Sequence, residues 1–471
     1  MSTTRRGLLR TAGALSGMGL FSSLAARSAY AADTSGYKAL VCCFLYGGVD
    51  GHDVVLPFDT SSYDAIADIR TSLYSGYAVG GDNNPRARQN MLQLSVQNAS
   101  NFGGREFALG PEASELHALF ESGNAAIVGN VGPLIEPTTR SLIDNGGVAL
   151  PSKLYSHNDQ QSTWMSLGPE GTSTGWGGLL ADAVVRSNAN TNPAFSAIST
   201  AGYNVMLAGQ ISRQFQLGLD GVSTITELED NSAWLFGGAE DPERIRAILT
   251  EHYRASGAVR TNLFERDMAA ASRRAIDNNE AFAQAVSDFD SLPVAFPQTY
   301  VGRQLRAIAA TIAGAGNLGA SRQIFMAAAG GFDTHDNQAD NLPDLIRDWS
   351  QAIGAFNQNM QALGLNDDVT LFTMSDFGRT LTVNGDGTDH GWGNHHFVVG
   401  GAVEGGRIYG DMPPPELETE QDASHGALIP TTSVEQFGAT LGRWFGLTEI
   451  ELRAAFPRLG NFPTSNVGFM G

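Results

Sequence analysis

The feature that most constrains the fold is a series of short apolar runs, each followed by a polar turn. The first run, Lys38 to Tyr46 (KALVCCFLY), is uninterrupted, which is typical of a strand buried on both faces. It leads into GGVDGHD, so a carboxylate-rich turn follows the strand directly. Similar runs predict further strands over residues 125–131, 194–199, 323–329, 369–374 and 397–399.

Segments with helical spacing of apolar residues lie between these runs, at 112–123, from 175 onward, and at 303–313, 342–363 and 434–445. This alternation predicts an α/β fold with one large, mostly parallel sheet and helices on both faces. In such sheets, ligands bind where the carboxyl ends of the strands meet. The stretch of about 230–300 has helical spacing but no strand pattern, so we expect a helical insertion within a single domain of residues 32–471.

Residues 1–31 have the pattern of a twin-arginine export signal. Arg5 and Arg6 precede a mildly apolar stretch, and small residues around Ala31 mark a cleavage site. The alternative is an exposed basic helix. The signal predicts a periplasmic or secreted protein. Beyond it, no stretch of about 18 uncharged apolar residues occurs, so we expect no transmembrane segment in the mature chain.

The net charge limits the classes of binding partner, and the cysteine content limits the disulfides that the chain can form. The chain has 49 acidic and 29 basic residues, a net charge of −20; cleavage after residue 31 removes four arginines and no acids, which gives −24. Such a surface repels nucleic acid and anionic lipid, and it admits an anionic substrate only if bound cations reverse the local field. Cys42 and Cys43 are adjacent in a strand, so we expect two buried thiols without an ordinary disulfide.

Potential ligands for a divalent cation follow several predicted strands. Asp50, Asp376 and the pair Asp333 and His335 stand a few residues past strand ends, and a loop after another strand holds His157. Asp389 and His390 lie in the glycine-rich stretch 371–401. Imidazole with carboxylate suits zinc, whereas oxygen-rich sets favour calcium, magnesium or manganese. A bound cation polarises a phosphoryl or sulfuryl oxygen and activates a nucleophile, so ester hydrolysis is the natural outcome.

Each candidate also has a structural interpretation. Asp50 could stabilise its turn or cap a helix, and Asp333 and His335 could form a hydrogen-bonded turn. Asp389 and His390 could lie in an exposed turn. His395 and His396 could divide, with one facing the core and one the site. The sequence has no Walker A motif, HExxH or CxxC, and no GxSxG between a strand and a helix.

Motifs along nearly the whole mature chain resemble the bacterial exported family named domain of unknown function 1501. These are FLYGGVDGHDVVLP, SHNDQQSTW, STGWGGLLAD, GGFDTHDNQ, SDFGRT, GTDHGWGNHHFVVGG and IPTTSVEQFGATLGRWFG. That family is similar to the alkaline phosphatase and sulfatase superfamily. The resemblance implies a sheet with metal ligands at its strand ends, one or two divalent ions or none, and a small-molecule or glycan ester as substrate.

The resemblance also assigns roles to residues. Asp50 matches the first-strand metal ligand, Asp333 and His335 match later ligands, and Asp376 and His390, with Asp389, complete the set. Ser156 is the candidate nucleophile, and His157 and Arg379 would aid proton transfer or stabilise charge. The alternative for Ser156 is a helix cap.

The sequence departs from the superfamily pattern in three ways, so one metal or none is possible. Phe377 stands where a second ligand is often found, and Asp333-x-His335 is tighter than the usual spacing. No Cys-x-Pro-x-Arg occurs, which argues against a formylglycine-type sulfatase.

Two functions follow. The first is an exported metal-dependent hydrolase of phosphate or sulfate esters. The alternative is a non-catalytic, alkaline phosphatase-like binding or assembly protein of the cell envelope. No pattern in the sequence sets the oligomeric state.

Overall fold

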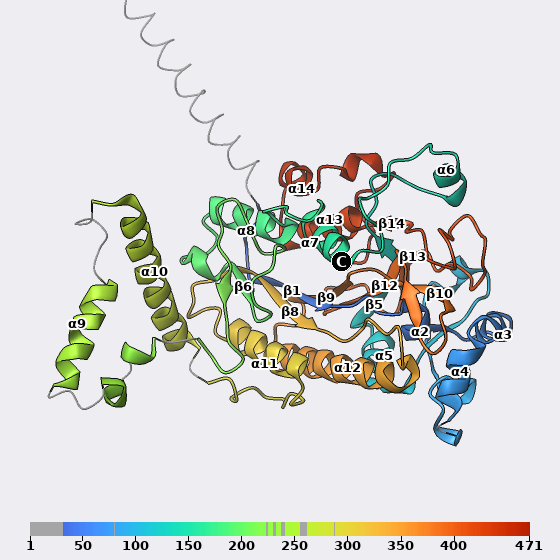
Figure 1. Ribbon diagram of the computed structural model, residues 1–471, viewed down its shortest axis with the longest axis horizontal. Coiled ribbons are helices and arrows are strands. Elements are labelled where there is room, and N and C mark those ends of the chain that lie inside the picture. The colour runs from blue at the N-terminus through green and yellow to red at the C-terminus, as the bar shows by residue number, and fades with distance from the viewer. Residues whose placement is uncertain are drawn as a thin grey trace, which may run out of the picture.

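The computed structural model describes residues 32–471, except residues 80, 223–224, 229–231, 237–240, 255–260 and 287 (Figure 1). The predicted export signal, residues 1–31, lies outside the described residues. Among the helices of the described part, none has the length and apolar character needed to cross a membrane.

A nine-stranded sheet forms the centre of the molecule, in the order β13-β5-β12-β9-β1-β8-β6-β7, with β14 also paired to β5. All pairs are parallel except those that β12 makes with β5 and β9. The predicted α/β fold with a mostly parallel sheet is therefore confirmed. The strands are β1 (Lys38–Leu45), β5 (Ala125–Gly132), β6 (Ala197–Ser199), β7 (Phe215–Gln216), β8 (Arg322–Ala329), β9 (Val369–Ser375), β12 (Asn394–Val399), β13 (Ile408–Gly410) and β14 (Thr432–Ser433).

Strand β1 lies between β8 and β9 and is in register with both. Its last residue, Leu45, pairs with Ala329 of β8 and with Ser375 of β9. Because the three strands are parallel and end at the same level, the loops that follow them begin side by side at one edge of the sheet.

Helices cover both faces of the sheet (Figure 1). On one face, Val41 and Cys43 pack in a core with α5 (Ser114–Glu121), α11 (Tyr300–Ala313) and α12 (Gln338–Ala362). On the other, Leu40 and Cys42 pack in a core with α8 (Trp176–Arg186), α13 (Val434–Phe445) and α14 (Glu449–Ala455). The two cysteines are buried and free, one toward each layer, as the uninterrupted apolar run predicts.

Smaller elements surround this body. Two small sheets join β2 (Val55–Pro57), β4 (Phe107–Leu109) and β3 (Leu92–Gln93), and β10 (Arg379–Val383) with β11 (Thr388–His390). The remaining α-helices are α2 (Gly51–Val54), α3 (Thr60–Ile69), α4 (Thr71–Ala78), α6 (Arg140–Asp144), α7 (His157–Ser166), α9 (Pro242–Arg254) and α10 (Leu263–Ala285). Helices α9 and α10 fall in the segment predicted to be a helical insertion, and Figure 1 shows them at one end of the molecule. The division into a single domain with an insertion stays a prediction.

Candidate metal centre

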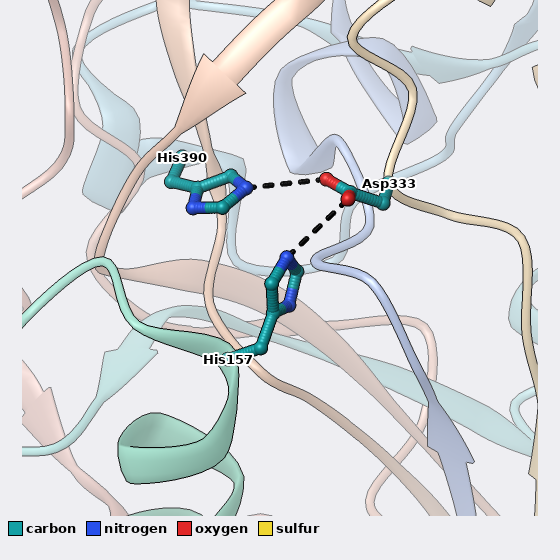
Figure 2. A group of neighbouring side chains, drawn as sticks. All are labelled: His157, Asp333 and His390. Carbon is teal, nitrogen blue, oxygen red and sulfur yellow. Dashed lines mark hydrogen bonds and ion pairs between the residues drawn. The ribbon is translucent and has the colours of Figure 1, made fainter.

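His157, Asp333 and His390 lie together beyond the carboxyl ends of the central strands (Figure 2). His157 is the first residue of α7, Asp333 follows β8, and His390 ends β11. One nitrogen of each histidine and a carboxylate oxygen of Asp333 all lie within 4.8 Å of one another. Three segments that are distant in the sequence therefore present two nitrogen donors and one oxygen donor to one point.

Asp333 lies between the two imidazoles. Its Oδ2 is 3.4 Å from His157 Nε2, and its Oδ1 is 3.2 Å from His390 Nε2. The side chain is 45% exposed, so solvent reaches the group. Burial favours a higher pKa for the Asp333 carboxyl, but the hydrogen bond and charge of Arg379 outweigh it, and the net pKa is lowered. Asp333 is thus kept as an anion.

Asp376 fixes the orientation of His157. Its Oδ2 is 2.6 Å from His157 Nδ1 and also accepts a hydrogen bond of 2.8 Å from Gln161 Nε2, while its Oδ1 accepts from the Gly47 N–H at 3.2 Å. The carboxylate is fully buried, and its hydrogen bond raises the pKa of His157. With a proton on Nδ1, a neutral His157 turns the lone pair of Nε2 toward Asp333.

A backbone carbonyl does the same for His390. His390 Nδ1 is 2.7 Å from the carbonyl oxygen of Tyr155. Tyr155 has φ of 71°, a left-handed conformation that is costly for a bulky side chain. Burial lowers the pKa of His390, so its neutral form is favoured. A neutral His390 that donates from Nδ1 presents a lone pair on Nε2 toward Asp333.

His335 adjoins this group. Its Nε2 is 3.2 Å from Asp333 Oδ1 and 2.9 Å from His390 Nε2, and its Nδ1 is 3.2 Å from Asp389 Oδ1. Asp389, which also accepts a hydrogen bond from Asn384, touches the group only through His335. The structure therefore places His335 beside the donors and Asp389 behind it.

Arg379 ties the surrounding loops together. The buried guanidinium donates to the carbonyl oxygens of Gly47, Gly48, Phe332 and Thr388, and to the Asp333 carboxylate. Since its donors are used in this way, Arg379 acts on the site through Asp333.

Phe377 and two glycines close the floor of the site. The Phe377 ring is fully buried, with its centroid 4.8 Å from that of His157 and 4.5 Å from that of His390. A Cβ on Gly48 would lie 2.4 Å from this ring, and one on Gly47 would lie 2.4 Å from the Asp333 backbone nitrogen. With φ of 117° at Gly47 and 81° at Gly48, both positions require glycine. An apolar ring thus fills the space where a second ligand was considered.

Asp50 does not join the group. Its two carboxylate oxygens accept from Arg70 at 2.7 and 3.1 Å, and Gln338 donates to Oδ2 at 2.7 Å. Asp50 and Arg70 are both fully buried. Asp50, which the resemblance assigns as a metal ligand, therefore lies in a buried ion pair apart from the three donors, where the guanidinium of Arg70 supplies the counter-charge. Asp376 is likewise placed behind His157 and not among the three donors.

Ser156 occupies the N-cap position of α7, but its side chain makes no cap hydrogen bond. The hydroxyl donates instead to Asp159 Oδ2 at 3.0 Å. His395 and His396 are both buried in the core and away from the group; His395 Nδ1 accepts from the Asn130 N–H.

Sequence reasoning missed three residues of this architecture: Tyr155, Gln161 and Arg70. Gln161 lies four residues after His157, and this spacing places both on one face of a helix, so a helical pattern at 157–166 would have indicated it. Tyr155 contributes a backbone carbonyl, which carries no signal in the sequence.

The donor set fits a divalent metal ion. Two histidines, each able to offer a lone pair on Nε2 when neutral, and one charged carboxylate form a set that zinc and related ions accept, with positions left open for water or substrate. The hydrogen bonds of Asp376 and Tyr155 to the far nitrogens are the outer contacts that such histidines usually have.

The fold and site define an α/β protein with a histidine and carboxylate cluster at the carboxyl edge of its sheet. The chain belongs to the family described as "Protein of unknown function (DUF1501)", whose model matches residues 37–454. This confirms the family that the motifs resemble. A search of curated proteins found no match.

Two solved structures are similar in fold. One is the PsFucS1 sulfatase from Pseudoalteromonas sp., with 10% identity, a TM-score of 0.33, and coverage of 88% of this chain and 68% of that chain. The other is Ps i-CgsB in complex with k-i-k-neocarrahexaose, with 10% identity, a TM-score of 0.32, and coverage of 91% and 77%. A likeness this distant says nothing about chemistry.

Proposed function

We propose that this protein is an exported, metal-dependent hydrolase of phosphate or sulfate esters. The observation that carries the proposal is the convergence of His157, Asp333 and His390 within 4.8 Å at an accessible point of the sheet edge. The mature chain is strongly acidic, so an anionic ester needs a cation at the site where it reacts. When bound there, a divalent ion would polarise the ester oxygen and lower the pKa of a hydroxyl or water.

The chain's own residues divide the remaining work. His157, Asp333 and His390 would hold the ion, and His335 lies in reach of Asp333 and His390 as a further donor. Asp376 fixes the tautomer of His157, and Arg379 keeps Asp333 ionised.

Ser156 remains the candidate nucleophile. Its hydroxyl hydrogen-bonds to the buried carboxylate of Asp159, and this carboxylate is placed to take the hydroxyl proton. Ser156→Ala should abolish turnover while the metal content stays unchanged. Turnover that survives in Ser156→Ala would instead assign the attack to a water molecule.

Elemental analysis followed by a panel of phosphatase, sulfatase and phosphodiesterase substrates tests the proposal. We expect about one equivalent of zinc or a related ion in protein purified after cytoplasmic folding, and hydrolysis of one ester class. His390→Ala should lose both the metal and the activity. A native protein without stoichiometric metal, or a folded His390→Ala variant with full activity, would overturn the proposal.

The alternative of a non-catalytic envelope protein rests on one observation. Arg379 already pairs with Asp333, so the cluster can be held without an ion. Metal-free protein that is as stable as the purified form and inert across the panel would favour this alternative.

A further inference from the structure

The N-terminal half of α10 carries apolar side chains that the described part of the molecule does not cover. Phe264 is 73% exposed and Met268 is 54% exposed, and Ala271 and Ala275 are exposed as well. Figure 1 shows α10 beside α9 at one end of the molecule, with α10 between α9 and the body that holds the sheet. Farther along the helix, Phe282 is fully buried and packs against Phe195 and Phe215. The helix is therefore anchored at one end and exposed at the other.

The exposed residues have the spacing of a seam between two helices. Phe264, Met268, Ala271 and Ala275 follow one another at intervals of four, three and four residues, and the same rhythm continues through Asn278 to Phe282. Such intervals place side chains on a single stripe that repeats every seven residues, which is the pattern of paired helices. The outer four residues of this stripe, which we call the α10 seam, have the spacing that a partner helix would fill.

The α10 seam is complementary to itself in size. Its large residues, Phe264 and Met268, come first, and its small residues, Ala271 and Ala275, come last. In an antiparallel pair of such helices, Phe264 would face Ala275 of the other helix and Met268 would face Ala271. Each layer would then combine one large and one small side chain, so the backbones could approach closely without a void.

The seam is also complementary to itself in charge. Asp267 and Arg274 are seven residues apart, so they flank the seam on the same side. Neither of them takes part in an ion pair with another residue of the described part. In the same antiparallel arrangement, each Asp267 would lie near Arg274 of the other copy, and the two-fold axis would produce this pair twice.

We propose that α10 is the dimerisation element of this protein, with the α10 seams of two copies packed antiparallel about a two-fold axis. Residues 261–285 carry four acidic and three basic side chains, so this segment is nearly neutral in a chain of net charge −20. Two copies can therefore approach here with little repulsion. An anionic lipid surface would require a basic excess, which the segment lacks.

A charge-swap experiment on the mature protein tests the arrangement. Asp267→Arg and Arg274→Asp should each raise the dimer dissociation constant by about thirtyfold, because two ion pairs become like-charge contacts in each case. An equimolar mixture of the two variants should recover native affinity, since the arginine introduced in one copy then faces the aspartate introduced in the other. Analytical ultracentrifugation measures the dissociation constants of the two variants and of their mixture. The matched control is Arg266→Asp, on the outer side of the same helix, which should dimerise as the native protein does.

Three results would overturn the proposal. The first is a native protein that stays monomeric up to about 100 µM. The second is a dimer that neither substitution weakens, or a mixture that fails to recover. The third is a monomer that sediments with phosphatidylglycerol vesicles through Phe264, which would assign the seam to lipid. All the substituted side chains are exposed, so unchanged circular dichroism and melting temperature verify that each variant is folded.

Discussion

Each imidazole of the candidate metal centre is fixed by the hydrogen bond on the far side of its ring. Asp376 holds His157 and the Tyr155 carbonyl holds His390, so both Nε2 atoms turn toward Asp333. Removal of a metal donor, of a residue that hydrogen-bonds to a donor, or of a more distant neighbour should therefore lower metal affinity by different amounts. Metal affinity can rank the residues where activity alone cannot.

Substitution of three aspartates by asparagine should lower metal affinity in a graded way. Asp333→Asn removes a donor and should weaken binding by more than about 100-fold, whereas Asp376→Asn removes an outer contact and should cost about 10- to 100-fold. Asp389, whose side chain is 60% exposed, contacts His335 and Asn384 but none of the three donors, so Asp389→Asn should change affinity less than about tenfold. Competition with a chromophoric chelator measures each value. Equal losses in all three would contradict the assignment of donors.

Three histidines outside the site should make the fold sensitive to acid. Burial lowers the pKa of His52, His395 and His396 to about 3 each. Between pH 6.5 and 3 the unfolded chain takes up protons at these positions and the folded chain does not, so stability falls as the pH falls. Each histidine should contribute a slope of about 1.4 kcal/mol per pH unit to the free energy of unfolding.

His396→Leu should reduce this slope by about 1.4 kcal/mol per pH unit, as urea unfolding at pH 6 and pH 5 would measure. His252→Gln, a change at an exposed position, is the control and should leave the slope unchanged. An unaltered slope in His396→Leu would show that His396 becomes protonated within the folded protein.

At the scale of elements, Arg70 joins three parts of the chain. It follows α3, pairs with Asp50 after β1, and donates to the carbonyl oxygens of Thr380 and Leu381 in β10. This residue links the exit of the central strand to the small sheet that carries His390. The ion pair is therefore expected to act on the architecture around the metal centre and not on the ion itself.

Asp50→Asn should lower the free energy of unfolding by about 3–5 kcal/mol, because it leaves the buried Arg70 without its counter-charge. Metal stoichiometry of the folded variant should stay the same. Chemical denaturation and elemental analysis measure the two quantities, and Asp64→Asn, on the exposed side of α3, serves as control. Loss of metal without loss of stability would restore Asp50 to the ligand set.

The same elements show what sequence reasoning can and cannot reach. Apolar runs located β1, β5, β8 and β9, and because parallel strands end together, Asp333, His335 and Asp376 were correctly expected at one edge. The pairing of Asp50 with Arg70 was not predictable, since Arg70 lies in a stretch without a motif and the contact depends on how α3 docks. The antiparallel direction of β12 was equally hidden, because a short apolar run carries no mark of its direction.

At the scale of the whole molecule, the candidate metal centre draws its donors from three separate segments, and the first and last donors, His157 and His390, are more than 200 residues apart. His157, Asp333 and His390 lie on α7, after β8 and at the end of β11, so an ion bound by all three would connect α7 and the edge of the central sheet to the small sheet. Binding to the folded chain alone should thus stabilise the entire domain.

Removal of the metal with a chelator should lower the melting temperature, and a zinc concentration about 100-fold above the dissociation constant should restore about 2.7 kcal/mol of stability. Differential scanning calorimetry with and without the ion measures the difference. His157→Ala is the control, and its melting temperature should no longer respond to zinc. A native protein that melts at the same temperature in chelator and in zinc would contradict an ion that bridges these segments.

The reactivity of the two adjacent cysteines at the centre of the sheet can report the opening of the helical layers that cover them. Burial raises the pKa of the Cys43 thiol to about 12 and that of Cys42 well above its usual value, so neither reacts while the layers stay closed. Cys42 lies under the layer of α8 and α13, and Cys43 under that of α11 and α12. The rate at which a thiol reagent labels each cysteine therefore measures how often the helical layer over that cysteine opens. Because the two cysteines are adjacent, a single labelled peptide gives the rates for both layers.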